Sequence, residues 1–347
     1  MTRIVFLDDF PFPTLGVGDA PFPVAESLRG GAISIGNFDG VHRGHQDLLR
    51  QLKRMAGELG GPAVAVVFDP QPAEILRPEA APVRLTDLET RAQRMKPLGI
   101  DFLLVCRSTE RLFSMTADQF FDQLIVDLLG AAGMVEGPNF FFGKDRLGDV
   151  RLLRQRCEQA AIRLQIADPL LDDSTPPAMI SSSRIRAALS AGDVRAAGEM
   201  LGRPHRVSGT VVDGAKRGRV IGFPTANLES VVGMLPALGV YAAGVTLPDG
   251  GSHHAAVHLG PNPTFDRDAE GRTADEGTSA SKMHPAKFEV HLLDYSGGLY
   301  GEVLKVDFVE RIRDVRRFES VERLTEQLRR DVATVRRELN LSSTASS

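Results

Sequence analysis

Short apolar runs and longer amphipathic segments alternate along the first half of the chain. Residues 32–35 and 63–68 are short apolar runs, which are typical of buried strands. Between them, apolar residues recur at intervals of three and four, which predicts a helix that begins near Gly44 and ends at Gly60 and Gly61. These apolar positions are Leu48, Leu49, Leu52, Met55 and Leu59. A strand, a helix and a strand in this order predict parallel strands joined by a right-handed crossover.

The same alternation continues to about residue 167. It predicts helices near 86–97, 117–130 and 149–160, and strands at 101–106, 134–137 and 163–167. We therefore predict a doubly wound α/β domain. Such domains bind ligands beyond the carboxyl ends of their strands. The stretch GNFDGVHRGH, Gly36 to His45, directly follows the strand predicted at 32–35 and is expected at that edge of the sheet.

The second half of the chain has a different pattern. Residues 181–201 predict two short helices, and the Val-rich runs after Gly202, separated by glycine or proline, predict an antiparallel β-barrel. An amphipathic segment from Ser320 to Leu339 predicts a C-terminal helix. The polar segment 266–287 is expected to be a loop. We predict a first domain at 1–190, a linker at 191–203, a second domain at 204–340 and a disordered tail at 341–347.

Composition agrees with two domains and narrows the class of protein. The chain has 347 residues, of which 42% are hydrophobic and 25% charged. No apolar run approaches the roughly 20 residues that a membrane-spanning helix needs, so we expect no membrane association. The first residues lack a basic start followed by an apolar block, and they contain Asp8 and Asp9 instead. We therefore expect no signal peptide and a cytoplasmic location.

Charge and cysteine content exclude further classes. Residues 1–190 carry 21 basic and 24 acidic side chains, and residues 191–347 carry 20 and 21. Neither half has the basic excess typical of nucleic-acid binding, so no nucleic-acid partner is expected. Cys106 and Cys157 are the only cysteines, which suggests two buried thiols in a reducing compartment rather than a disulfide framework.

The stretch GNFDGVHRGH places two histidines, His42 and His45, three residues apart. The start of the helix supplies unpaired N–H groups that favour an anion, and imidazoles can add hydrogen bonds to it. Zinc would need further ligands, and Asp39 is the only acid nearby. These residues favour a phosphate site, while a zinc site and purely structural histidines remain as alternatives.

A second stretch of polar residues, Gly209 to Leu228, opens the predicted barrel. Gly214 and Gly218 flank two basic residues, which suggests a flexible turn that can lie over phosphates. Thr225 and Asn227 offer neutral oxygens of the kind that bind magnesium together with phosphate and water. A glycine-rich hairpin followed by a proline turn is the structural alternative.

Both stretches resemble known families. GNFDGVHRGH resembles the GxFDxxHxGH signature of nucleotidylyltransferases, and ISSSRIR at 180–186 resembles their second signature, ISST-x-I/V-R. The run ending in GFPTAN is similar to the signature of riboflavin kinases, and residues 288–331 resemble the rest of that kinase domain. In this order, over about residues 30–338, the chain resembles the bacterial bifunctional riboflavin kinase/FAD synthetase family.

The resemblance implies a Rossmann-like nucleotidylyltransferase domain followed by a riboflavin kinase barrel. Such an enzyme phosphorylates riboflavin to FMN and adenylylates FMN to FAD, with ATP as co-substrate and Mg2+ as cofactor. By this resemblance, His42 and His45 are expected to stabilise the α-phosphate of ATP. Glu289 is expected to be the base that accepts the proton of the riboflavin 5′-hydroxyl.

The other residues implied by the resemblance form three groups. ATP or its phosphates would be bound by Gly36, Asn37, Phe38, Asp39, Gly44, Ser181, Ser182, Arg186, Lys216, Gly218, Thr225 and Asn227. The flavin would be bound by Phe68, Asp69, Pro70 and Asn139. Magnesium would be bound by Thr225 and Asn227.

Some positions depart from the family pattern. Gln71 replaces the histidine of F-x-P-H-P, and Phe141 replaces the usual arginine of G-x-D/N-F-R-F-G, although Lys144 and Arg146 lie nearby in the sequence. The kinase segment N-I-G-x-R-P-T begins here with His258. Two alternatives follow: a kinase with a weakened adenylyltransferase, or a flavin-sensing protein without turnover. Glu289 and the intact PTAN sequence argue against the second, because binding alone needs neither a base nor a magnesium site.

Overall fold

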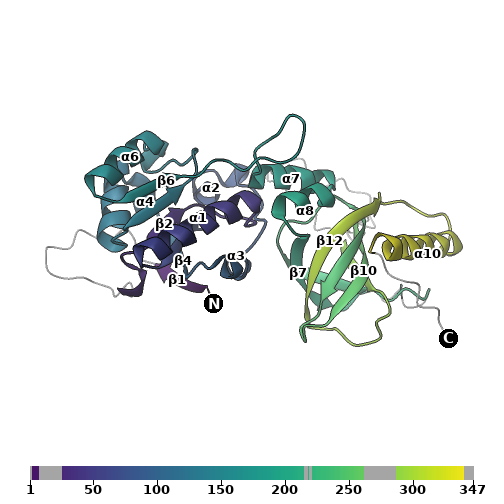
Figure 1. Ribbon diagram of the computed structural model, residues 1–347. Helices are drawn as coiled ribbons and strands as arrows, with labels where there is room; N and C mark the ends of the chain where they lie inside the picture. The colour runs from purple at the N-terminus through teal and green to yellow at the C-terminus, as the bar shows by residue number, and fades with distance from the viewer. Residues whose placement is uncertain (1, 8–25, 215–217, 219–220, 262–286, 340–347) are drawn as a thin grey trace. The chain divides into compact units, whose positions relative to one another are not determined.

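The computed structural model describes residues 2–7, 26–214, 218, 221–261 and 287–339 (Figure 1). Lys216, the tail predicted at 341–347, and the predicted loop up to residue 286 lie outside these ranges. The chain forms two compact units, residues 1–82 with 87–181 and residues 83–86 with 182–347. The predicted domain limits at 190 and 204 stay a prediction.

The first unit contains a six-stranded sheet in the order β1-β4-β3-β2-β5-β6, in which all neighbours pair in parallel. Its strands are β1 (Arg3–Leu7), β2 (Ala32–Ile35), β3 (Ala63–Asp69), β4 (Phe102–Arg107), β5 (Gly133–Glu136) and β6 (Arg163–Ile166). The predicted parallel sheet is confirmed. The sequence analysis did not predict β1, although residues 4–7 form a short apolar run. Only Leu7 of this edge strand is buried.

Helices cover both faces of this sheet. They are α1 (Arg43–Leu59), α2 (Pro72–Leu76), α3 (Leu88–Met95), α4 (Glu110–Ser114), α5 (Ala117–Phe120), η4 (Phe121–Leu128) and α6 (Val150–Gln159). Shorter 3-10 turns are η1 (Glu26–Leu28), η2 (Pro78–Ala80), η3 (Lys96–Leu98) and η5 (Lys144–Arg146). The helix predicted at 117–130 continues beyond Phe120 as a π-helix, η4. Ile33 and Val64 pack with the residues of η4 and α6, whereas Ala32 and Ala63 pack with those of α1 and α3. The sheet is therefore doubly wound, as predicted.

The second unit begins with α7 (Ser182–Ala191) and α8 (Val194–Leu201) and continues as a closed antiparallel barrel. The barrel order is β10-β11-β8-β7-β12-β9. Its strands are β7 (His205–Val212), β8 (Ala226–Val232), β9 (Gly239–Thr246), β10 (Ser252–Gly260), β11 (Lys287–Leu292) and β12 (Val303–Arg313), and α10 (Val321–Glu338) follows. Barrel and C-terminal helix are confirmed. The loop predicted at 266–287 is one residue too long, because Lys287 pairs with Gly260 at the start of β11.

Two features of the barrel wall matter for the site. Phe288, Val290 and Leu292 of β11 are buried, so the intervening residues of this strand point to the opposite, outer face. The sequence did not predict β8, since its residues have no regular apolar alternation. Its place in the wall comes from pairing with β7 and β11.

A buried ion pair holds α10 against the barrel. Asp331 of α10 is 3% exposed and accepts hydrogen bonds from Arg313 of β12, at 2.9 Å from Nε and 2.6 Å from Nη2. Gln327, one turn earlier, donates to the same carboxylate at 2.8 Å. The carboxylate is therefore solvated by protein donors in place of water.

We expect Asp331→Asn to lower the free energy of unfolding of the barrel by about 2 kcal/mol, because Arg313 loses its charged acceptor. The chain has no tryptophan and its three tyrosines, Tyr241, Tyr295 and Tyr300, all belong to this unit. Tyrosine fluorescence during denaturant unfolding therefore reports on the barrel alone. Glu326→Gln, at an exposed pair on the same helix, is the matched control and should change stability by less than about 0.5 kcal/mol. Equal effects of both substitutions would contradict the anchoring role.

Candidate active sites

The two histidines of the first signature lie at the start of α1. His42 is the N-cap residue, and its Nδ1 accepts a hydrogen bond from the backbone N–H of His45 at 3.2 Å. The two imidazole rings are stacked, with 3.6 Å between centroids and 17° between planes. Because Nδ1 of His42 is an acceptor, the proton of the neutral ring is on Nε2, where it can be donated to a ligand.

The electrostatics of the pair keep His45 uncharged. Burial lowers the pKa of His45 well below its usual value, and the charges of His42 and Arg91 lower it further. Its Nδ1 is buried and forms no hydrogen bond with the residues that the structure describes. A neutral imidazole beside the N–H groups of a helix start can hydrogen-bond a phosphate oxygen. The zinc alternative gains no support, since no three His, Cys, Asp or Glu side chains within the described ranges are placed to hold a metal ion.

The loop that leads to His42, residues 36–42, is called the histidine loop below, and it has an unusual backbone. Phe38 and Val41 have positive φ angles of 46° and 42°, and Gly40, between them, has a φ of 82°. The Phe38 ring is buried and lies edge-on to the His45 ring, with 5.3 Å between centroids. Asn37 is exposed, whereas Asp39 is buried. Of the loop residues predicted to bind ATP, Phe38 and Asp39 therefore lie beneath the surface, where they can support the histidines.

The second signature starts beside the first. A Cβ on Gly44 would lie 3.2 Å from the His42 ring and 3.6 Å from the carbonyl oxygen of Ile180. The contact with the His42 ring would be tight, whereas the contact with Ile180 would be an ordinary one. Ile180, which continues directly into Ser181, therefore lies beside the start of α1. Ser182 is the first residue of α7, and Nε of Arg186 in that helix donates to the carbonyl of Val83 at 2.7 Å.

The predicted flavin residues follow two strands that flank β2. Asp69 ends β3 and is joined to Pro70 by a cis peptide bond, and Asn139 lies three residues beyond β5. Because β3, β2 and β5 are parallel neighbours, their carboxyl ends lie at one edge of the sheet. Phe68 is partly buried and Asn139 is exposed. The histidine loop and the predicted flavin residues thus share this edge.

The two departures from the family pattern in the first unit, Gln71 and Phe141, have distinct surroundings. Gln71 is buried at the start of α2, and its Nε2 forms no hydrogen bond with the described residues. Phe141 is exposed, and the Arg146 guanidinium lies 4.6 Å from the centroid of its ring. A cation therefore lies next to position 141, although it comes from a residue five positions later.

In the barrel, three polar residues from separate strands form one row across the wall. Asn227 of β8 pairs with Glu289 of β11, and Glu289 pairs with His258 of β10. Residues that pair directly across strands point to the same face, so these three side chains share the outer face of the barrel. The strand pairing brings together residues that are 31 or more positions apart.

Glu289 is held by two partners. Nζ of Lys287 lies 2.7 Å from Oε1, and Nδ1 of His258 lies 3.3 Å from Oε2. Burial raises the pKa of Glu289, but the hydrogen bonds from His258 and Lys287 outweigh it, and the net pKa lies below its usual value. Glu289 is therefore an ionised carboxylate at neutral pH, as a proton acceptor must be.

Gly214 and Gly218 pack closely against the predicted magnesium residues. A Cβ on Gly214 would lie 2.1 Å from Nδ2 of Asn227, and a Cβ on Gly218 would lie 2.2 Å from the carbonyl oxygen of Phe223 and 3.4 Å from Oγ1 of Thr225. Any side chain at Gly214 would displace Asn227. The glycines are therefore required by close approach of the backbone.

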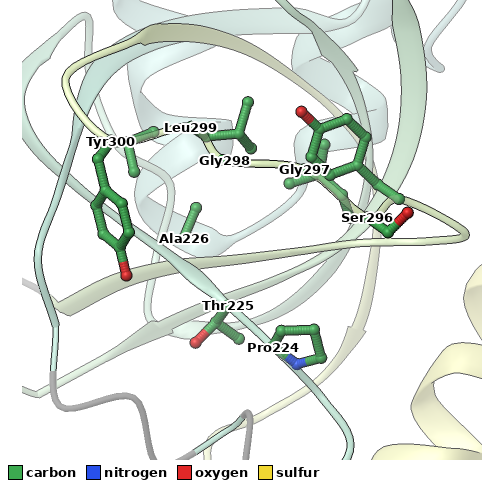
Figure 2. A pocket seen from close by; sticks show the side chains of 11 residues that line it. Pro224, Thr225, Ala226, Ser296, Gly297, Gly298, Leu299 and Tyr300 are labelled. Atoms are coloured by element: carbon green, nitrogen blue, oxygen red, sulfur yellow. The ribbon is translucent and has the colours of Figure 1, made fainter.

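A cavity of about 560 Å³ lies beside Thr225 (Figure 2). Pro224, Thr225 and Ala226 form one side of it, and the loop from Tyr295 to Tyr300 lines another. Of the predicted kinase residues that the structure describes, only Thr225 lines this cavity. Its volume suits a small organic ligand.

Comparison with known families separates the chain into the same two parts. A family model described as FAD synthetase matches residues 24–184, and one described as riboflavin kinase matches residues 201–339. The bifunctional riboflavin kinase/FMN adenylyltransferase of Pseudomonas fluorescens is 38% identical over 89% of this chain and 93% of its own. The chain belongs to the bifunctional riboflavin kinase/FMN adenylyltransferase family. It has both activities, phosphorylation of riboflavin and adenylylation of FMN.

Two further matches also cover nearly the whole of both chains. The bifunctional riboflavin kinase/FMN adenylyltransferase of Escherichia coli K12 is 33% identical over 91% of this chain and 95% of its own. A solved structure described as a macrolide-efflux protein from Streptococcus pneumoniae matches with a TM-score of 0.77 and 31% identity, over 89% of this chain and 94% of that one. Within the described residues of the present chain, no helix is long and apolar enough to cross a membrane.

Sequence reasoning missed two buried residues of the FMN adenylyltransferase part, Arg91 and Glu136. Arg91 lies on the buried side of α3, where one basic residue among several in the helix gives no signal of its own. Glu136 ends β5, and a single acid at a strand end usually faces solvent. Only the packing shows that both contact the segment around the histidine loop.

The Glu136 side chain supplies a hydrogen bond where the backbone pairing of β2 with β5 has ended. β2 and β5 pair only at Ala32 with Gly133 and at Ile33 with Met134. Beyond these pairs, Oε1 of Glu136 accepts the backbone N–H of Ile35 at 2.7 Å, immediately before Gly36. Burial raises the pKa of Glu136 well above its usual value of 4.5, although the Ile35 hydrogen bond lowers it.

We expect the stability contributed by Glu136 to fall as the pH rises. With a raised pKa in the folded state, the folded protein keeps a proton that the unfolded chain releases above pH 4.5, so stability declines from there towards the raised pKa. Glu136→Gln keeps an acceptor for Ile35 without the titration. The stability of the variant relative to wild type should increase over this interval in thermal unfolding followed by circular dichroism. A difference that does not change with pH would contradict the raised pKa.

Proposed function

We propose that His42 and His45 stabilise the transferring phosphate in adenylyl transfer and that Glu289 is the base of the kinase reaction. The observation that carries the first role is the stacked pair of imidazoles at the start of α1, in which burial keeps His45 uncharged. The observation that carries the second is the row of Asn227, Glu289 and His258 on the barrel wall.

Adenylyl transfer needs no covalent intermediate with the protein. A phosphate oxygen of FMN attacks the α-phosphorus of ATP, a new P–O bond forms, and the bond to pyrophosphate breaks. Negative charge accumulates on the oxygens of the α-phosphate as phosphorus becomes crowded. In this proposal, Nε2–H of His42, the His45 ring and the N–H groups at the start of α1 would donate to these oxygens. Gly36, Asn37, Gly44, Ser181, Ser182 and Arg186 would bind the ATP phosphates, with Phe38 and Asp39 beneath them.

The flavin of FMN would lie at the same edge of the sheet. Phe68 and Asp69 end β3, Pro70 follows them, and Asn139 lies beyond β5, on either side of the histidine loop. Arg146, stacked on Phe141, supplies a cation close to Asn139 in the chain. This placement supports binding of FMN with its phosphate directed towards the histidines.

In the kinase reaction, Glu289 orients the 5′-hydroxyl of riboflavin and accepts its proton as oxygen bonds to the γ-phosphorus of ATP. The bond between the γ-phosphorus and ADP breaks in the same step. The low pKa of Glu289 means that it does not ionise the alcohol beforehand, but takes the proton as the P–O bond forms. Lys287 and His258 hold the carboxylate in place.

Thr225 and Asn227 fit a magnesium site. Their side chains supply neutral oxygens two residues apart at the start of β8, and Gly214 and Gly218 closely approach Asn227 and Thr225. A bound Mg2+ would neutralise charge on the ATP phosphates. Lys216 and Gly218 would contact the phosphates, and the cavity beside Thr225 would receive part of the nucleotide or the flavin.

One assay tests both parts of this proposal. The protein is incubated with riboflavin, ATP and Mg2+, and the flavins are separated by chromatography. We expect FMN first and then FAD. FMN without FAD would indicate that Gln71 and Phe141 weaken the adenylyltransferase site, and omission of Mg2+ should stop both steps. The cytoplasmic location predicted from the sequence stays a prediction.

A further inference from the structure

Arg91 of α3 is a fully buried arginine, with 0% of its surface exposed. An isolated guanidinium in a protein interior is strongly unfavourable, so its burial needs specific partners. The helix places it among core residues, with Ala92 and Met95 of α3 also buried. Its position therefore depends on what its five N–H donors contact.

Two contacts of the Arg91 guanidinium reach the histidine loop. Nη1 donates to the carbonyl oxygen of Asn37 at 3.1 Å, and Nη2 lies 3.6 Å from Oδ1 of Asp39. Asp39 is 1% exposed, so its carboxylate and the guanidinium form a buried pair. The two contacts bracket Phe38, the residue whose φ is 46°.

These two contacts, with Asn37 and with Asp39, explain how the loop keeps a strained backbone. Left-handed conformations at Phe38 and Val41 each cost on the order of 1 kcal/mol, and they persist only where surrounding contacts hold them. The contact with the Asn37 carbonyl holds the peptide plane before Phe38, and the contact with the Asp39 carboxylate holds the residue after it. The Phe38 ring lies against His45. Arg91 thus acts on His45 through the backbone and through the Phe38 ring.

We propose that Arg91 is a positioning residue for adenylyl transfer, which fastens Asn37 and Asp39 so that His42 and His45 meet the transferring phosphate. This inference rests on the proposed role of the two histidines. Arg91 is too deeply buried to contact a substrate itself, and it lies 46 or more residues from both histidines in the sequence.

The test compares a single and a double variant, which separate an effect on the position of the histidines from an effect on stability. Arg91→Met leaves Asp39 buried without this partner and is expected to destabilise the protein. The double variant Arg91→Met with Asp39→Asn removes both charges and should regain much of that stability. A positioning role predicts that the kcat for FMN adenylylation stays at least about tenfold low in the double variant, because misplacement of a catalytic group is costly even in a stable fold. Arg91→Lys, which can donate to the Asn37 carbonyl, should recover part of the kcat.

Several controls make the outcome decisive. Phosphorylation of riboflavin by the same preparations should change by less than about twofold, and so should adenylylation by Arg50→Met, at an exposed arginine of α1. Wild-type kcat in the double variant would overturn the positioning role. If His45→Ala also retains full turnover, the proposed histidine mechanism fails as well. If His45→Ala is inactive and the double variant is fully active, only the inference about Arg91 fails.

Discussion

Replacing His45 with alanine is expected to lower FMN adenylylation by about 100-fold while riboflavin phosphorylation continues. Loss of one fixed donor to a developing oxyanion costs on the order of 3 kcal/mol in the barrier, which corresponds to this factor. His42→Ala should have an effect of the same size. The measurement is the rate of FAD formation from FMN and ATP, with FMN formation from riboflavin measured in parallel.

His42 needs a more careful control, because it also caps α1. Removal of an N-cap acceptor costs about 1 kcal/mol of stability and could reduce activity by another route. His42→Asn keeps a good capping side chain but has no imidazole. We expect His42→Asn to be as stable as wild type and nearly as inactive in adenylylation as His42→Ala. Full turnover in His42→Asn and His45→Ala would remove the histidines from the mechanism.

Replacing Glu289 with glutamine is expected to abolish FMN formation, with a rate lower by on the order of 1,000-fold, because glutamine keeps the shape but accepts no proton. FMN supplied directly should still be converted to FAD by this variant. The measurement is chromatographic, with riboflavin as substrate in one series and FMN in the other.

The kinase experiment has its own matched control. Lys305→Gln changes an exposed residue on β12, elsewhere on the barrel, and should leave FMN formation within about twofold of wild type. Loss of both activities in Glu289→Gln would indicate misfolding, and tyrosine fluorescence would show it. Retained FMN formation in a folded Glu289→Gln protein would exclude Glu289 as the base.

The pH dependence of the kinase reaction gives a related expectation. The pKa of Glu289 lies below the usual glutamate value of 4.5. The carboxylate therefore remains ionised when the pH falls from neutrality to 4.5. A decline in FMN formation within that interval would therefore have to come from another group. His258, whose Nδ1 lies 3.3 Å from Oε2 of Glu289, is the neighbour to examine by substitution.

Periodicity along the chain was sufficient for the main elements of both domains. The three- and four-residue spacing in α1 and the apolar runs of β2 and β3 are local properties, which depend on which face of one element is buried. The strands that escaped prediction, β1 and β8, have irregular burial because each is defined by its neighbours in the sheet. Pairing between distant segments leaves little trace in local periodicity.

The sequence by itself determined the two fold classes, their order and the signatures that contain His42, His45, Thr225 and Asn227. Glu289 could be assigned only by family resemblance, since a lone acid in a strand carries no chemical signal. Tertiary structure alone decided which residues surround these groups. Strand register places His258 and Asn227 beside Glu289, and helix packing carries Arg91 to the loop before His42. The physical reason is that register and burial depend on contacts between segments far apart in the chain, whereas sequence patterns report contacts within one turn or one strand.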